Sequence, residues 1–234
     1  MKKFLILAVV SVMALGLFAG CSGDAEPQTF VGLSDEGRGY AEVELTMQGD
    51  EIVEVNIVEY TNMGEAKDYA SYGNPDRFSG EELKEAHESL AEQIVETNSA
   101  DVDAHTGATS TSNKVVQAVE RALAKANDDV EGDYLDGTFF GRHEGERGYY
   151  IAHVTIENDA ITAVNLEETQ GVGSEAELKD EEYGYEDWLP AREEMQERFV
   201  NENSADVDAY TGATGSSEGW MEAVQDALNN AAVN

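Results

Sequence analysis

Apolar residues occupy every second position from Ala41 to Met47, with polar residues between them. This period is that of a β-strand with one buried face. A Gln-Gly-Asp turn at 48–50 separates it from a β-branched stretch at 52–58, and the two together predict a β-hairpin. The same pattern returns at 149–156 and 161–166, around a turn at 157–159, and predicts a second hairpin.

A helical period follows each hairpin. Ser79 and Glu82 have the spacing of a capping box, and apolar residues then recur at helical intervals up to Val95. The counterpart in the second half is expected to begin at Pro190, because proline is favoured at the first helical position. Another amphipathic helix closes each half. Strands followed by helices predict an α+β fold, in which each half is an antiparallel twisted sheet packed with helices.

The two halves of the sequence are copies of one repeat. Thr-Phe-Val-Gly at 29–32 returns as Thr-Phe-Phe-Gly at 138–141, and Arg-Gly-Tyr at 38–40 returns at 147–149. Asn-Ser-Ala-Asp-Val-Asp-Ala and Thr-Gly-Ala-Thr likewise each occur once in each half. A period above about 100 residues is too long for a solenoid. We therefore expect tandem domains at 29–127 and 135–234, joined by an acidic linker at 128–134.

The N-terminus has the pattern of a secretory signal. Lys2 and Lys3 precede an apolar run at 4–18, which is short for a membrane-spanning helix, and small residues lead to Cys21. The end of this run resembles a bacterial lipobox, with Phe18 where leucine is preferred. The resemblance implies that 1–20 is removed, that Cys21 is diacylated, and that 21–28 is a polar tether. The alternative is an ordinary signal peptide that happens to contain a cysteine.

The repeated Thr-Gly-Ala-Thr stands at the predicted start of the last helix in each half. Hydroxyls, a glycine and free backbone N–H groups at a helix N-terminus form an anion site that suits a phosphate. The simpler interpretation is an N-cap, in which a Ser or Thr side chain accepts a hydrogen bond from the first turn. Near-identical duplication of the block in divergent surroundings favours a binding role.

The spacing Asp-x-x-Ser/Thr-Gly-Ala-Thr before a helix resembles the signature of FMN-binding domains with covalently attached flavin. The resemblance implies that a flavin transferase links the phosphate of FMN to Thr109 and to Thr214 through phosphodiester bonds, so that the chain carries two covalent FMN groups. The other matching positions are Asp103, Thr106, Gly107 and Ala108 in the first copy and Asp208, Thr211, Gly212 and Ala213 in the second.

This family also carries a Glu-Thr-Pro-Gly-Leu-Gly-like loop near the flavin ring. The second copy matches it at Glu168, Thr169, Gly171 and Gly173. The first copy keeps only Glu59 and Gly64, so its ring contacts are expected to differ. Aromatic residues of the middle segments are candidates to cover the ring or, alternatively, to form small satellite cores; they are Tyr69, Tyr72, Tyr183, Tyr185 and Trp188.

The charged residues and histidines of the chain exclude some classes of function. The chain has 14 Lys and Arg against 49 Asp and Glu, a formal net charge of −35, which excludes binding to the phosphate backbone of nucleic acid. The same charge would oppose binding to an anionic membrane surface, so attachment is expected to come from lipid. Acidity on this scale is compatible with a saline habitat. Neither a catalytic residue set nor a metal site is expected, since the four histidines do not cluster at ligand spacing.

The resemblance as a whole implies an electron carrier, and not a turnover enzyme, on the outer face of the cytoplasmic membrane. Its layout is similar to that of flavinylated lipoproteins of extracellular electron transfer in Gram-positive bacteria. Its electrons would come from a quinol- or NADH-dependent membrane donor and pass to soluble flavin, metal ions or a redox protein. One alternative is a non-redox lipoprotein that binds a ligand or partner; another is a flavin-dependent extracellular reductase.

Overall fold

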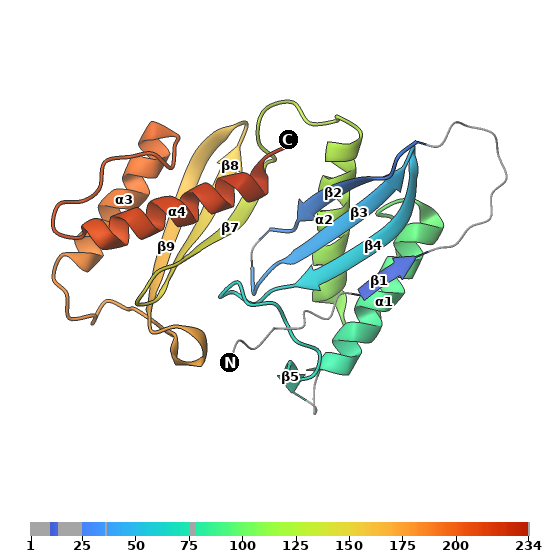
Figure 1. Cartoon of the computed structure of the whole chain (residues 1–234), viewed down its shortest axis with the longest axis horizontal. Coiled ribbons are helices and arrows are strands. Elements are labelled where there is room, and N and C mark those ends of the chain that lie inside the picture. The colour runs from blue at the N-terminus through green and yellow to red at the C-terminus, as the bar shows by residue number, and fades with distance from the viewer. Residues whose placement is uncertain (1–9, 14–24, 36, 75–77, 234) are drawn as a thin grey trace. The chain divides into compact units, whose positions relative to one another are not determined.

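The computed structural model describes residues 10–13, 25–35, 37–74 and 78–233 (Figure 1). The chain forms two compact units, Met1–Asp129 and Val130–Asn234. Each unit is an antiparallel sheet with two long helices, so the predicted α+β class and its two-domain layout are confirmed. Among the helices of these described ranges, none combines the length and apolar character needed to cross a membrane.

The sheet of unit 1 has the strand order β1-β4-β3-β2. Its strands are β1 (Val10–Met13), β2 (Gln28–Leu33), β3 (Ala41–Gln48) and β4 (Glu51–Glu59). β1 lies within the predicted signal peptide, so this edge strand would leave the sheet if the predicted cleavage occurs. The rest of that peptide and Cys21 fall outside the described residues.

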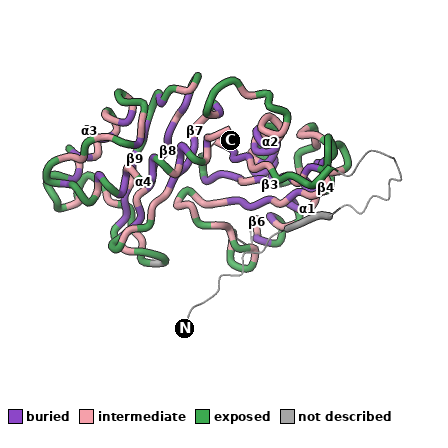
Figure 2. Tube along the Cα trace, turned by 45° about the horizontal axis from the view of Figure 1, so that its top comes forward, coloured by how far each residue is buried: buried purple, intermediate pink, exposed green. Residues whose placement is uncertain are grey.

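One face of this sheet is covered by α1 (Gly80–Thr97) and α2 (Thr109–Ala126), and a short ribbon of β5 (Gly73–Asn74) and β6 (Phe78–Ser79) precedes α1. The inward positions of β3 and β4 are buried against the apolar stripes of both helices. Figure 2 shows the buried residues of these strands as purple segments of the tube. The predicted capping box of Ser79 and Glu82 begins α1 and is confirmed. Gly32 allows close helix packing, since a Cβ there would lie 2.0 Å from the carbonyl oxygen of Ala118.

Unit 2 repeats this arrangement, with the strand order β10-β9-β8-β7. Its elements are β7 (Gly137–Glu144), β8 (Tyr149–Glu157), β9 (Ala160–Gln170), a 3₁₀ turn η1 (Gly173–Glu175), β10 (Glu177–Leu178), α3 (Trp188–Glu202) and α4 (Thr214–Ala231). Gly141 has the role of Gly32, because a Cβ there would lie 2.1 Å from the carbonyl oxygen of Ala223 in α4. The repeated Thr-Phe-x-Gly thus marks a strand that packs directly on the last helix.

Both predicted hairpins are confirmed, as β3–β4 and β8–β9. The turn of the second hairpin places Asn158 and Asp159 at φ values of 53° and 59°, as a two-residue type I′ turn requires. The expected start of α3 at Pro190 is wrong, because the helix begins two residues earlier, at Trp188. Proline is tolerated there since the N–H groups of the first turn have no acceptor within the helix.

Candidate functional site

The two Thr-Gly-Ala-Thr segments run directly into the last helix of each unit. Helix α2 begins at Thr109 and α4 begins at Thr214, and the N-cap residues are Ala108 and Ala213. Neither cap makes a side-chain hydrogen bond, so the N-cap interpretation of this motif is wrong. Both threonine side chains are exposed, and no hydrogen bond of their hydroxyls to another described residue is seen. Each helix start therefore keeps its N–H groups and an adjacent hydroxyl available to a ligand.

A buried serine fixes this loop in each unit. The Oγ of Ser112 accepts from the backbone N–H of His105 and donates to the carbonyl oxygen of Ala108, both at 3.0 Å. Ser217 repeats the two bonds with Tyr210 and Ala213 at the same distances. The serines hold the loop without using the N–H groups of the first helical turn. Sequence reasoning missed them, although their identical placement in both repeats was a signal.

The glycine of each motif lies in a tight turn. Ala108 N–H donates to the carbonyl oxygen of His105 at 3.0 Å, and Gly107 between them has a φ of +86°, as in a type II turn. A Cβ on Gly107 would meet no atom within 4 Å, so a ligand can approach the backbone closely. Gly212, with a φ of +102°, is more enclosed, since a Cβ there would lie 2.7 Å from the carboxylate of Asp187.

The predicted aspartates lie beside these loops. The side chains of Asp103 and Asp208 are exposed, as are those of Thr106 and Thr211. Their backbones are tied to the preceding helix: Asp103 N–H donates to Oε1 of Gln93 at 3.0 Å, and Arg198 donates to the carbonyl oxygen of Asp208. The predicted motif residues are therefore held together at one end of each unit.

In unit 1 a buried charge cluster lies where β4 meets α2. Its centre is Glu59, which is 3% exposed. The Glu59 carboxylate accepts hydrogen bonds from Lys67 at 2.5 Å, Lys114 at 3.1 Å and the hydroxyl of Thr111 at 2.9 Å. Nε2 of His87 lies 3.6 Å from the same carboxylate. Because Thr111 belongs to the first turn of α2, the cluster touches the helix start that carries Thr109.

The cluster shifts the ionisation of its own members. Burial alone would raise the pKa of Glu59, but His87, Lys67 and Lys114 together outweigh burial and hold this pKa well below the ordinary value of 4.5. Burial, followed by the nearby charges of Glu88 and Glu59, raises the pKa of Tyr69 to about 12. The Tyr69 hydroxyl lies 2.8 Å from Nδ1 of His87. Glu59 is therefore a carboxylate and Tyr69 a neutral phenol at neutral pH.

Unit 2 places Glu168 at the corresponding point of β9. Its buried carboxylate accepts from Lys179 and, at 2.7 Å, from the indole N–H of Trp188. Thr169 is also buried: its hydroxyl accepts from the backbone N–H of Tyr149 at 2.8 Å and donates to the carbonyl oxygen of Gly171 at 3.1 Å. The side chains of Glu168 and Thr169 thus brace the loop from inside, and Val172 and Gly173 are its exposed part.

The aromatic candidates divide between core and surface. Trp188 is only 1% exposed and belongs to the main core of unit 2, so neither predicted role, ring cover or satellite core, describes it. Tyr183 packs edge-on against Trp188, and the ammonium of Lys67 lies 4.6 Å from the Tyr72 ring centroid. Tyr185 is half exposed and donates to the carbonyl oxygen of Gly212 at 2.5 Å. Tyr185 therefore contacts a motif loop directly.

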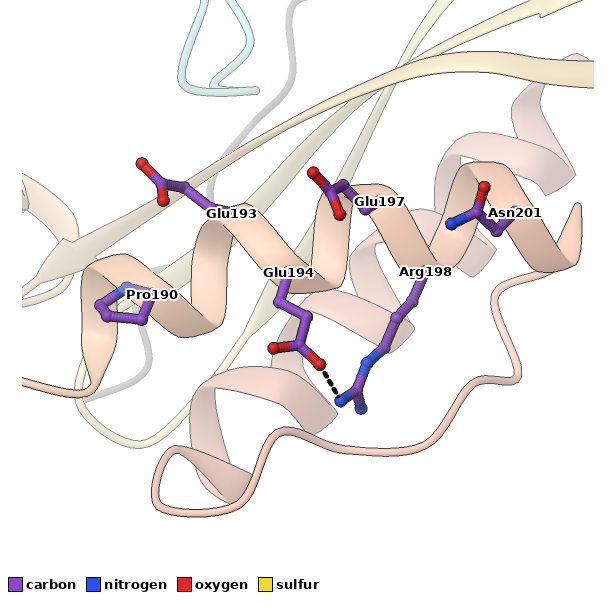
Figure 3. Close-up of a pocket in the computed structure, with 6 residues that line it drawn as sticks. All are labelled: Pro190, Glu193, Glu194, Glu197, Arg198 and Asn201. Atoms are coloured by element: carbon purple, nitrogen blue, oxygen red, sulfur yellow. Dashed lines mark hydrogen bonds and ion pairs between the residues drawn. The ribbon is translucent and has the colours of Figure 1, made fainter.

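A hollow of about 450 Å³ lies on the outer face of α3 (Figure 3). It is lined by Pro190, Glu193, Glu194, Glu197, Arg198 and Asn201. This lining carries three carboxylates and one guanidinium, which is paired with Glu194, and such an excess of negative charge suits neither a phosphate nor a flat apolar ring. Within the described part of the chain, no group of His, Cys, Asp or Glu is placed to hold a metal ion. The helix starts remain the candidate sites.

Comparison with known proteins agrees with this geometry. The model of the family described as FMN-binding domain matches residues 37–124 and 148–229, one segment in each unit, and each segment contains one complete motif. The chain belongs to the FMN-binding domain family. It is therefore a flavin-binding protein. No curated protein matches the sequence. The crystal structure of the CPE2226 protein from Clostridium perfringens is similar at 22% identity, covering 42% of this chain and 88% of that chain, with a TM-score of 0.36.

The residues at both helix starts fit the phosphate end of FMN. N–H groups of the first turn, an exposed hydroxyl and a turn glycine in the left-handed region are the donor set that an anionic ester needs. The two FMN-binding domains are alike in this set. They differ in the buried polar groups at the end of the hairpin. Unit 1 has a cluster of charges around Glu59, and in unit 2 Glu168 is bonded to Lys179 and to the indole of Trp188.

Proposed function

We propose that this FMN-binding domain protein is a lipid-anchored, extracytoplasmic electron carrier with one FMN esterified to Thr109 and one to Thr214. The observation that carries the proposal is the exposure of both threonine hydroxyls at the first position of helices that have no side-chain cap. A hydroxyl at this position belongs to the positive end of the helix, where a phosphodiester is stabilised.

The attachment step is a phosphoryl transfer by a flavin transferase. The threonine oxygen forms a bond to the FMN phosphorus of a flavin dinucleotide donor, the nucleoside monophosphate leaves, and the hydroxyl proton is lost to solvent. In this chain the helix N–H groups bind the phosphate, the turn at Gly107 or Gly212 allows its approach, and Ser112 or Ser217 keeps the loop in place. When bound, FMN supplies the capacity to take up and release one or two electrons.

Location and partners are part of the same proposal. Diacylation of Cys21 would hold the acidic protein at the membrane, since each buried CH2 contributes roughly 0.8 kcal/mol. A quinol- or NADH-dependent membrane donor would reduce it, and soluble flavin, metal ions or a redox protein would oxidise it. Intact mass of the membrane-fraction protein is expected to show a diacylglycerol group that Cys21→Ala removes; a wild-type protein without that mass would contradict lipid anchoring.

Intact mass tests the covalent attachment. Coexpressed with a flavin transferase, the protein is expected to gain the mass of two FMN groups and to fluoresce in a denaturing gel. Thr109→Ala and Thr214→Ala should each remove one group, and the double variant should remove both. Ser110→Ala, which removes an exposed hydroxyl one position further along α2, is the matched control and should keep both. A wild-type protein without added mass would refute covalent flavinylation.

A further inference from the structure

Each unit contains a buried carboxylate paired with a lysine near the end of its hairpin. Glu59 pairs with Lys67, and Glu168 pairs with Lys179. In both pairs the backbone N–H of the lysine also donates to the carbonyl oxygen of the glutamate, at 2.8 Å. This second bond fixes the loop between the two residues. The ion pair is therefore a shared part of the two units, and a difference around it separates them.

Unit 1 adds a second cation to this pair. Lys114, the sixth residue of α2, reaches Glu59 at 3.1 Å and also donates to the carbonyl oxygen of Arg38 at 3.3 Å. Its side chain is 13% exposed. Two ammonium groups thus share one carboxylate, and both lie in the network that Thr111 connects to the start of α2. The contacts leave a surplus of one positive charge.

Unit 2 has no room for the corresponding lysine. The sixth residue of α4 is Gly219, and a Cβ there would lie 2.4 Å from the ring of Tyr150. Tyr150 stands at the repeat position that Ala41 occupies in unit 1. Glu168 receives its second hydrogen bond from the neutral indole of Trp188. One ammonium therefore balances one carboxylate, and the contacts leave no surplus charge.

We infer that Lys114 makes the FMN at Thr109 easier to reduce than the FMN at Thr214, so that the protein carries two unequal electron-accepting sites. The inference rests on the proposed function. Two-electron reduction of a flavin at neutral pH takes up one proton, so the reduced group carries one more negative charge than the oxidised group. A surplus positive charge nearby stabilises that form. One unit charge at about 10 Å and an effective dielectric constant near 20 changes the ratio of reduced to oxidised FMN on the order of tenfold.

Potentiometric titration of single-flavin variants measures this difference. Thr214→Ala retains FMN only in unit 1, and Thr109→Ala retains it only in unit 2. The first is expected to have the higher midpoint potential, by about tenfold in the reduced-to-oxidised ratio, or roughly 30 mV for a two-electron couple. In the Thr214→Ala background, Lys114→Gln should remove most of this difference and Lys114→Arg should restore it. Rescue by arginine separates a role of the charge from a role of the side-chain volume.

A matched graft tests the inference in the opposite direction. In the Thr109→Ala background, Tyr150→Ala with Gly219→Lys recreates the Ala41 and Lys114 pair and should raise the midpoint potential of the unit 2 flavin. Tyr150→Ala alone is the control for the lost ring.

The outcomes separate the two proposals. FMN attached in both units with equal midpoint potentials, or with a potential insensitive to Lys114→Gln and to the graft, would overturn the inference alone. No FMN mass on either threonine would overturn the proposed function and the inference with it.

Discussion

The two units share their helix-start loops and differ in the polar interior behind those loops. The serine bonds, the turn glycine and the threonine at the first helical position are repeated almost without change. Behind them, unit 1 buries a charge cluster around Glu59, and unit 2 buries Trp188 next to Trp220, with ring centroids 6.3 Å apart. Features needed for attachment are therefore kept in both units, whereas the surroundings of the attached group diverge.

Both interiors obey the same physical requirement. A buried carboxylate is costly unless each of its oxygens finds a partner. Unit 1 meets this requirement with two lysines, a threonine and a histidine, and unit 2 with one lysine and an indole N–H. Both arrangements give the carboxylate oxygens partners, but the groups in contact leave different net charges.

Both tryptophans lie in unit 2, which makes the comparison measurable within the intact protein. Tryptophan fluorescence reports the unfolding of unit 2, and far-ultraviolet circular dichroism reports that of both units. Shared features should affect the two units alike, and divergent features should affect one.

The largest effect is expected at the shared glycines. Gly32→Val and Gly141→Val would each place a side chain about 2 Å from the backbone of the packed helix, as their Cβ positions show. We expect each to destabilise its own unit by more than about 3 kcal/mol in urea titrations, because neither strand nor helix can move apart without opening the core. Only Gly141→Val should shift the fluorescence transition; an unchanged transition in that variant would contradict the observed packing.

The next largest loss of stability is expected at the buried glutamates, whose number of lysine partners differs between the units. Glu59→Gln leaves two partly buried lysines without a counter-charge, and Glu168→Gln leaves one. We expect losses of about 3–4 kcal/mol for Glu59→Gln and about 2 kcal/mol for Glu168→Gln, measured by circular dichroism and fluorescence respectively. Equal losses of stability in the two variants would show that Lys114 contributes little to the electrostatics of the Glu59 cluster. Lys114→Gln in the Glu59→Gln background should recover part of the stability, since it removes one uncompensated charge.

The dependence of stability on pH tests the ion pairing of Glu59 in a second way. The pKa of Glu59 is depressed in the folded protein, so its ionised form stabilises unit 1 above the unfolded pKa near 4.5, and this contribution is lost as the pH falls below that value. One such group contributes a slope of about 1.4 kcal/mol per pH unit, or roughly 2 kcal/mol between pH 4.5 and 3. The Glu59→Gln protein should lack this increment when compared with wild type by urea titration at each pH. Parallel curves would mean that Glu59 titrates normally.

Local patterns predicted much of this structure. The hairpins and the capping box follow from periods and turn residues within a few positions of one another, and the repeat placed Thr109 and Thr214 at helix starts. The pair of Glu59 and Lys114 has no such signal, because 55 residues separate its members. Trp188 follows two acidic residues that suggest exposure, yet its core position depends on contacts from β9 and α4. Strands β2 and β7 were missed, since Thr-Phe-x-Gly is too short to show alternation.

The smallest effect is expected at the serines that both units share. Ser112→Ala and Ser217→Ala remove the acceptor of one loop N–H, that of His105 or Tyr210. The carbonyl oxygens of Ala108 and Ala213 lose little, because each also accepts from the backbone N–H of the same serine. One unsatisfied N–H costs about 1–2 kcal/mol.

These two losses should agree within about 0.5 kcal/mol, although the interiors of the units differ. Ser110→Ala, at an exposed position of the same first turn, is the control and should change stability by less than about 0.5 kcal/mol. Each buried serine variant should also carry less FMN at its own threonine after coexpression with the transferase, as read by intact mass. A loss of stability without a loss of FMN would show that the transferase accepts a loosened loop, and the serines would then serve folding alone.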